Sequence, residues 1–267
     1  MKRLHIIISL LFLPITLLNS ANAQIDIHKP NVADVVEDVR GRMEGVIEWG
    51  VTKDLSLEAG VEARLKNNIG SMDRIHTFVG ATYDINKHIK IGGEYILINM
   101  YDSQIKGWES HRHRANLNVE GEVEAGDFEF SLRERVQTTF RTDSVNRYEK
   151  SNPEAILRSR LVATYKIPHS RWSPYLLFEL HNTLNAPKAV ANFKTDKYGV
   201  DNYVTRYRGG VGVKYRVDRD HRLDFYYYFD FDRSYNIDYK GNKGNLKGYI
   251  LERELRHIFG ISYKVKL

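Results

Sequence analysis

The fold is decided by the stretch Leu55-Ser56-Leu57-Glu58-Ala59-Gly60-Val61-Glu62-Ala63-Arg64-Leu65-Lys66. Every odd position is apolar, and every even position is polar or glycine. This alternation has a period of two, whereas an amphipathic helix repeats about every 3.6 residues, so the stretch is predicted to be a β-strand. Strands of soluble proteins usually have about 5–6 residues, and a tilted membrane strand needs about 9–11. The length of this stretch therefore favours a strand that crosses a membrane.

The same alternation recurs along the chain, in segments at 74–84, 114–124, 128–133, 157–167, 206–216, 222–232 and 259–267. Less regular strands are expected at about 42–51, 88–101 and 174–184, which makes eleven in all. A closed bacterial barrel of antiparallel strands has an even strand number, so twelve strands are predicted, with ten as the alternative. The twelfth strand would lie in 24–40 or within 233–252. Residues 32–39 have apolar positions at i, i+3, i+4 and i+7, so a short helix is the other interpretation of this segment.

The connections alternate in length. Short turns are expected near 52–54, 86–87, 125–127, 168–173 and 218–220, and longer loops near 67–73, 102–110, 142–154, 185–203 and 233–252. Short turns on one rim and long loops on the other are typical of outer-membrane barrels, whose short turns face the periplasm.

Alternation alone does not show which face points outward. Eleven or twelve strands enclose more space than the side chains of a small barrel fill. An apolar interior of Ala, Val and Gly would leave a large dry void, whereas a charged interior can hold water. We therefore expect an all-β, closed antiparallel transmembrane barrel with its apolar face against lipid. A large soluble β-sandwich or a lipid-carrying periplasmic barrel is the alternative.

The N-terminal segment indicates export. Lys2 and Arg3 precede an apolar run at 6–18, and Ala21-Asn22-Ala23 supplies small residues for a signal peptidase. Cleavage after Ala23 is expected, which divides the chain into a signal peptide at 1–23, an N-terminal segment at 24–40 and a barrel at 41–267. The predicted location is the outer membrane. Without Lys2 and Arg3 the formal net charge falls from +6 to +4, and no basic run indicates nucleic acid.

The polar faces carry the candidate site. An acidic strip on the first two strands faces a basic strip on the fifth to seventh strands, and such a field orients solutes in a pore. The predicted pore-lining residues are Glu44, Glu48, Glu58, Glu62, Arg112, Arg114, Glu120, Arg133, Arg135, Arg158, Arg160, Arg206, Arg208, Asp230 and Asp232. The same arginines could instead plug the lumen. The preferred functions are a narrow passive channel for small polar or charged solutes, or a structural membrane protein.

Two turns predict the register of these charges. Pairing Val217 with His221 sets three opposite-charge pairs across the strands, Lys214 with Asp224, Arg208 with Asp230, and Arg206 with Asp232. Pairing Val51 with Leu55 instead opposes like charges, Glu48 with Glu58 and Glu44 with Glu62. Water, Arg42 and Arg64, or a weakly bound divalent cation would relieve this repulsion.

Other functions are less favoured. A barrel-embedded lipid acyl hydrolase would need a serine beside His111 or His113, and the inferred register places Phe140 and Thr138 opposite them. A surface-ligand barrel would bind through the polar loop at 238–245. No catalytic residue, metal site or cofactor is predicted. The expected partners are outer-membrane lipid, with periplasmic chaperones and the barrel-assembly machinery during biogenesis.

The residue patterns also resemble a known family. The segments that carry the resemblance are 55–66, Arg133-Glu134-Arg135-Val136-Gln137, 157–161, 174–182, 207–230 and 257–267. They are similar to the bacterial outer-membrane family catalogued as domain of unknown function 2490. The resemblance covers nearly all of the chain after the signal peptide. It implies an outer-membrane β-barrel and no established reaction.

Overall fold

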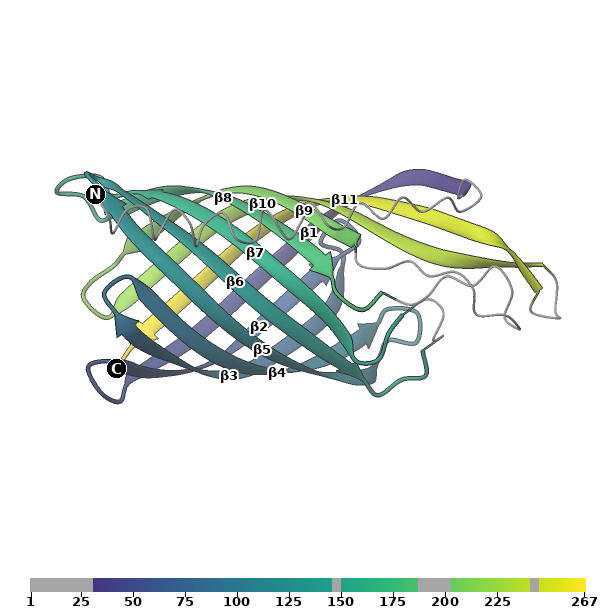
Figure 1. Cartoon of the computed structure of the whole chain (residues 1–267), viewed down its shortest axis with the longest axis horizontal. Coiled ribbons are helices and arrows are strands. Elements are labelled where there is room, and N and C mark those ends of the chain that lie inside the picture. The colour runs from purple at the N-terminus through teal and green to yellow at the C-terminus, as the bar shows by residue number, and fades with distance from the viewer. Residues whose placement is uncertain (1–30, 146–149, 187–202, 241–244) are drawn as a thin grey trace.

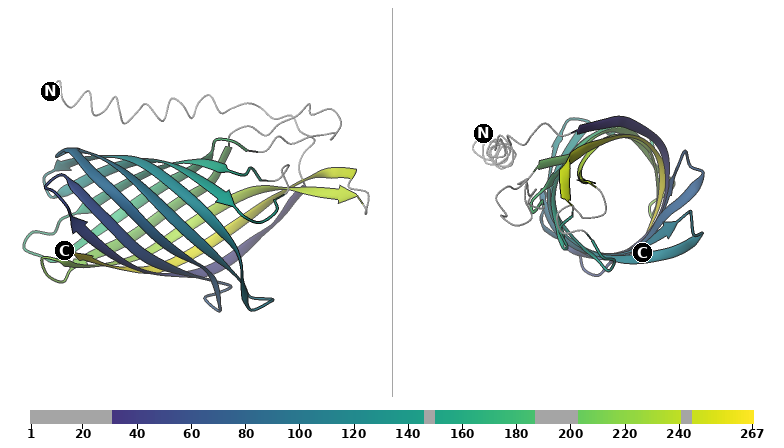
Figure 2. Two further views of the ribbon diagram at one scale, coloured as in Figure 1. Left: turned by 90° about the horizontal axis from the view of Figure 1, so that it is seen from below. Right: turned by 90° about the vertical axis from the view of Figure 1, so that its right-hand side faces the viewer.

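The computed structural model describes residues 31–145, 150–186, 203–240 and 245–267. These residues form eleven strands in chain order: β1 (Asn31–Gly50), β2 (Leu55–Lys66), β3 (Ser71–Asn86), β4 (Ile89–Asp102), β5 (Gly107–Ala125), β6 (Phe128–Arg141), β7 (Glu154–Tyr165), β8 (Trp172–Thr183), β9 (Tyr203–Arg216), β10 (His221–Lys240) and β11 (Asn245–Lys266). Each strand pairs with the next along the chain, and β1 pairs with β11, which closes the barrel (Figures 1 and 2). In the described part of the chain, no helix is long and apolar enough to cross a membrane.

The closure of the barrel differs from the expected one. The structure has eleven strands, so the predictions of twelve and of ten are both wrong. With an odd number of alternating strands, the first and the last run in the same direction. The pair β1–β11 is therefore parallel, whereas every other neighbouring pair is antiparallel.

The segments expected to hold a twelfth strand lengthen existing strands instead. Residues 31–40 begin β1, and Val39 pairs with His257 of β11, so of the two interpretations of 32–39 the strand agrees with the structure and the short helix is wrong. The valines of this segment are β-branched, and pairing with β11 overrides their helical spacing. Residues 31–40, which were expected to precede the barrel, are therefore part of its wall. Residues 1–30, with the predicted signal peptide and cleavage site, lie outside the described residues.

The expected long loop at 233–252 is mostly strand. β10 and β11 stay paired from His221–Val265 as far as Lys240–Asn245, and residues 241–244 lie outside the described part. Figure 1 shows this hairpin projecting beyond the ends of most other strands. The described ends of the predicted binding loop at 238–245, residues 238–240 and 245, therefore belong to β10 and β11.

The predicted alternation of short turns and long loops is confirmed only in part. The connections 142–153 and 184–202 are long, but 67–70 and 103–106 have four residues each, like the turn 51–54, because their strands extend into the expected loops. We call the end of the barrel with connections 51–54, 87–88, 126–127, 166–171 and 217–220 the short-turn rim, and the opposite end the long-loop rim. Short turns set the register because they leave little freedom in how the flanking strands pair. The loop 187–202 is outside the described residues.

The two faces of the wall have the expected polarity. Apolar side chains on the outward face are exposed, among them Leu57, Val61, Val119, Val211 and Phe225. The alternate positions point into the barrel and include fully buried charged side chains, such as Glu179 and Asp230. The apolar face therefore looks out of the barrel, and the charged face looks in.

Inward aromatic rings lie over glycines of the neighbouring strand. A Cβ atom at Gly210 would collide with the ring of Tyr228, and one at Gly260 would collide with Tyr226. The glycines thus make room for two tyrosine rings that stack with centroids 4.4 Å apart inside the barrel. These rings narrow the lumen on the side of β9 to β11.

Candidate functional site

The described strands enclose at least two cavities, which lie one above the other along the barrel. The long-loop cavity, nearer the long-loop rim, has a volume of about 290 Å³, and the short-turn cavity has a volume of about 320 Å³. Their lining residues come from strands around the whole ring, from β1 and β2 through β7 to β11. Both cavities therefore lie in the lumen.

Five residues border both cavities, and all five are arginines. They come from β1, β2, β5, β7 and β9, and they are Arg42, Arg64, Arg114, Arg158 and Arg208. We call this set the arginine ring. Because it separates the two cavities, a solute that moves between them passes the ring.

Carboxylates neutralise part of the arginine ring. Arg64 donates to Glu62, and Arg42 lies 3.9 Å from the same carboxylate. Nη2 of Arg158 lies 3.0 Å from both oxygens of Glu179.

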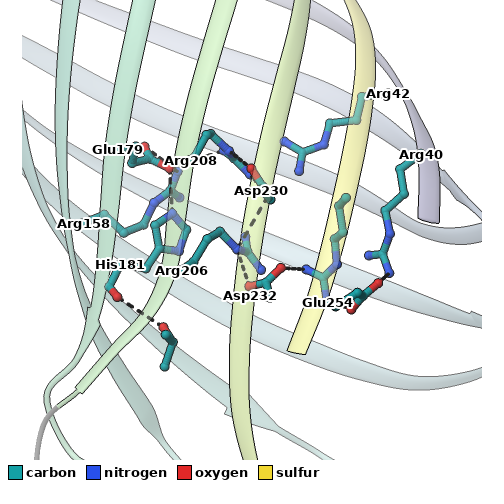
Figure 3. Close-up of polar contacts among 12 residues, drawn as sticks. Arg40, Arg42, Arg158, Glu179, His181, Arg206, Arg208, Asp230, Asp232 and Glu254 are labelled. Carbon is teal, nitrogen blue, oxygen red and sulfur yellow. Dashed lines mark hydrogen bonds and ion pairs between the residues drawn. The ribbon is translucent and has the colours of Figure 1, made fainter. Parts of the chain in front are cut away.

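The remaining two members of the ring differ in their partners. Arg208 donates hydrogen bonds to Asp230 from Nε and Nη2, at 2.6 and 2.7 Å. It donates a third, of 3.3 Å, to Glu179 (Figure 3). Arg114 has a neutral partner, because its Nε donates to the hydroxyl of Thr139 at 3.1 Å. Five guanidinium groups thus face three carboxylates, which leaves a formal excess of two positive charges.

The ion-pair network continues toward the junction of β11 and β1. Arg206 lies 2.6 Å from Asp232, and Arg256 contacts both Asp232 and Glu254. Glu254 accepts a hydrogen bond of 2.6 Å from Arg40 of β1 (Figure 3). The network therefore links β9 and β10 to the parallel closure of the barrel.

The register predicted for β9 and β10 is confirmed. Lys214 lies opposite Asp224, Arg208 opposite Asp230, and Arg206 opposite Asp232. The last two form ion pairs. Asp224 instead accepts a hydrogen bond of 3.0 Å from the hydroxyl of Tyr175.

The predicted acidic pairs on β1 and β2 are also confirmed, since Glu44 lies opposite Glu62 and Glu48 opposite Glu58. Repulsion between Glu48 and Glu58 is relieved by Lys264 of β11, whose Nζ lies 2.6 Å from Glu48 and 3.5 Å from Glu58. Lys264 thus supplies a positive charge between Glu48 and Glu58, where a weakly bound divalent cation was one of the expected alternatives. Across the described ranges, no group of three or more possible metal ligands lies together.

The basic strip lies on β5 to β7 as predicted. Arg133 is opposite Arg160, and Arg135 is opposite Arg158. All predicted pore-lining residues except Glu48, Glu120 and Asp230 line one or both cavities. Glu48 and Asp230 pair with lysine and arginine inside the barrel, and Glu120 lies opposite Arg133.

Sequence reasoning left many lumen residues out of the candidate site, and four of them belong to the arginine ring or contact it. Arg42 and Arg64 were expected only as neighbours that relieve Glu repulsion, and they prove to belong to the arginine ring. Glu179 and His181 lie on β8, whose alternation is weak, and their side chains are hydrogen-bonded at 2.6 Å. The i, i+2 spacing of these two polar residues within an otherwise apolar strand was the available signal.

The histidines of the hydrolase alternative lie on the outward face. The inferred register, with Phe140 opposite His111 and Thr138 opposite His113, is wrong by two residues. His113 lies opposite Phe140 and is hydrogen-bonded to Tyr95 at 2.6 Å. The placement of Thr138 is wrong, because Thr138 pairs with Ala115. His111 is hydrogen-bonded to Asn99 at 2.6 Å, and the Thr142 hydroxyl donates to its backbone carbonyl. Neither contact joins an imidazole to a serine.

The fold and the lumen define a closed β-barrel with a charged, arginine-rich interior. The chain belongs to the family described as "Protein of unknown function (DUF2490)", whose model matches residues 47–240. A search of curated proteins finds no match.

Two solved structures are similar to part of this chain. The first, described as "NanC porin structure in rhombohedral crystal form", is 13% identical with a TM-score of 0.43, and the match covers 72% of this chain and 86% of that one. The second, described as "Outer-membrane expressed OmpT of Vibrio cholerae", is 12% identical with a TM-score of 0.34, and the match covers 73% of this chain and 59% of that one.

Proposed function

We propose that this protein is an outer-membrane channel for small solutes and that it prefers anions. The arginine ring between the two lumen cavities carries this proposal. A guanidinium group stays charged at all physiological pH values, so the preference does not depend on pH. Low-dielectric walls focus the field of such charges onto passing ions.

The charges of the long-loop cavity support the same preference. Its lining contains thirteen arginine and lysine residues, whereas its acidic residues are Asp73, Glu154 and Asp232. A solute from the long-loop side would first meet this positive field and then the arginine ring. Anions would be concentrated there, and cations would be repelled.

The size of the cavities limits the solutes. One water occupies about 30 Å³ in the liquid, so each cavity has room for a small organic ion or a short row of waters. The channel is therefore expected to be narrow. The apolar outward face supports its placement in lipid, because the charged residues would be on the watery side of the wall.

Bilayer recording of the purified barrel tests the channel directly. In a tenfold gradient of KCl, we expect conductance steps and a reversal potential displaced toward the chloride equilibrium potential. Absence of conductance would contradict a channel and would favour a structural role. Conductance with cation preference would contradict the role of the arginine ring.

Arg114→Gln is the sharpest variant of the ring. In the part of the chain that is described, Arg114 is bonded to neutral Thr139, so its replacement leaves no paired carboxylate behind. We expect weaker anion preference with an intact barrel. Arg222→Gln is the matched control, because Arg222 is exposed near the short-turn rim and outside both cavity linings. An equal effect of both substitutions would argue against the ring.

A further inference from the structure

The inward charges form a ladder that runs around the barrel. Every strand except β2 contributes one residue, and each residue lies opposite the next in register. From β7 onward the ladder reads Arg160, Glu179, Arg208, Asp230, Arg256 and Asp38 of β1. In the other direction, β6 to β3 contribute Arg133, Glu120, Lys90 and Asp84. The signs alternate on both sides.

The alternation breaks at one position. Arg133 of β6 and Arg160 of β7 lie directly opposite each other, so two positive charges are adjacent. Like charges opposed across a strand pair are destabilising, and the effect grows where the local dielectric constant is below that of water. An anion bound between Arg133 and Arg160 would restore the alternation of charge at this position.

The neighbouring carboxylates are directed elsewhere. Glu179 lies opposite Arg160 in register, but its oxygens are bound by Arg158 and Arg208. Neither Arg133 nor Arg160 has a carboxylate within 4.0 Å among the described residues. Within that same part of the chain, Nε of Arg160 is buried without a hydrogen-bond partner.

The adjacent arginine pair provides a contrast. Arg135 and Arg158 are also opposite each other, but each has a carboxylate, Glu94 at 3.3 Å and Glu179 at 3.0 Å. The barrel therefore neutralises one arginine pair internally and leaves the other unneutralised. Both Arg133 and Arg160 line the short-turn cavity, which gives a solute access to them.

We propose that Arg133 and Arg160 form a binding site for an oxyanion in the short-turn cavity. Guanidinium groups present paired N–H donors that match a carboxylate or a phosphate. The occupant would be the carboxylate or phosphate group of a small solute, held between β6 and β7. This inference rests on the proposed channel and gives it a saturable site instead of a general preference for anions.

Equilibrium binding tests the site without requiring conductance. The full folded barrel in detergent would be titrated calorimetrically with inorganic phosphate and, separately, with succinate, at constant ionic strength set by chloride. We expect saturable binding of at least one probe, and the two titrations distinguish a phosphate site from a carboxylate site. If neither probe binds above the chloride background, the proposal is overturned.

Substitutions locate the binding. Arg133→Gln and Arg160→Gln should each weaken binding about tenfold or more, since each removes one charge-assisted hydrogen-bonding group. Arg222→Gln is the matched control, because Arg222 also lies opposite an arginine, Arg216. Both of these side chains are exposed near the short-turn rim, so this substitution should leave binding unchanged. Equal weakening by all three would show that only overall charge matters and would overturn the site.

Unfolding separates loss of binding from loss of structure. Without oxyanion, Arg133→Gln and Arg160→Gln should be at least as resistant to denaturant as the wild type, because each relieves repulsion between the pair. With phosphate or succinate, the wild type and Arg222→Gln should gain more resistance than Arg133→Gln and Arg160→Gln. If the barrel conducts ions but binds neither probe, the oxyanion site is overturned and the proposed channel is not. If it binds a probe but does not conduct, the proposed channel is overturned and the oxyanion site is not.

Discussion

Arg208 is the side chain with the most buried partners in the lumen. It binds Asp230, whose side chain is 0% exposed, and Glu179, which is 1% exposed. A carboxylate left without its cation in such a place loses both its ion pair and its hydrogen bonds. Without Arg208, Glu179 would keep Arg158 at 3.0 Å, but Asp230 would keep only Arg206 at 3.6 Å and would lose both of its short hydrogen bonds.

Arg208→Gln should lower the free energy of unfolding by about 3–5 kcal/mol, the usual cost of removing one member of a buried ion pair. The free energy of unfolding of Arg208→Lys should lie between those of Arg208→Gln and the wild type, because lysine keeps the positive charge but cannot form the bidentate hydrogen bond to Asp230. Urea titration in lipid vesicles, followed by tryptophan fluorescence, measures both. A wild-type midpoint for Arg208→Gln would contradict the prediction.

Glu134 is an acidic residue on the apolar outward face. Its neighbours in register are Val119 and Ser159, and the Ser159 hydroxyl donates a hydrogen bond of 2.7 Å to it. If this face contacts lipid, the carboxyl group is costly there, and the serine hydroxyl offsets part of the cost.

The double substitution Glu134→Val with Ser159→Ala should therefore raise the free energy of unfolding in vesicles, by about 1 kcal/mol. Replacing both partners by apolar groups leaves no unsatisfied polar atom. Ser159→Ala alone should lower stability, because Glu134 then loses its hydrogen bond. The same urea titration checks the signs, and a destabilised double variant would argue against lipid contact at this position.

At the scale of elements, the parallel pair β1–β11 is the feature that distinguishes this barrel from one with an even strand number. Ile47 lies beside Val265 in this pair, with both side chains on the outward face. Adjacent strands are about 4.7–4.9 Å apart, within the range that a disulfide can span. The chain contains no cysteine, so any disulfide would come from introduced residues.

Ile47→Cys with Val265→Cys should form a disulfide on oxidation, visible as a shift in gel mobility of the denatured chain. Ile47→Cys with Ile261→Cys is the control, since Ile261 is four residues from Val265, about 13 Å along the strand. A strand between β1 and β11 would keep Ile47 and Val265 about 10 Å apart and prevent the bond. Absence of the disulfide would thus contradict the parallel closure.

At the scale of the whole molecule, closure removes the strand edges that long strands would otherwise expose. Every described strand has two neighbours in the ring, and the inner face carries the charges. A closed ring unfolds only when many hydrogen bonds break together. Resistance of the closed ring to unfolding predicts the mobility of the unheated protein on detergent gels, and the outward apolar face predicts the membrane fraction in which the protein is recovered.

The protein should be recovered with outer membranes after fractionation. It should also run faster on detergent gels when unheated than when boiled, because a closed barrel stays compact in detergent until it is heated. Recovery in the soluble fraction would contradict the membrane location. Identical mobility of the two samples would contradict a heat-resistant closed barrel.

The sequence alone determined the properties that depend on near neighbours. Alternation of side chains identifies the strands, because the pleat turns successive residues to opposite faces. Short turns then set the register, so the pairs of Arg208 with Asp230 and of Glu48 with Glu58 follow from counting along the chain. The charged interior follows from the number of strands, since a ring of this size cannot be filled by small apolar side chains.

Only the tertiary structure decided what depends on closing the ring. The strand number and the parallel pairing of β1 with β11 could not be derived from local patterns, because residues 32–39 have helical spacing but belong to the strand that pairs with β11. The same holds for Lys264 between Glu48 and Glu58 and for the arginine ring, which joins five strands far apart in sequence. A periodic pattern specifies the face of a strand, whereas the meeting of distant faces depends on the curvature and stagger of the whole barrel.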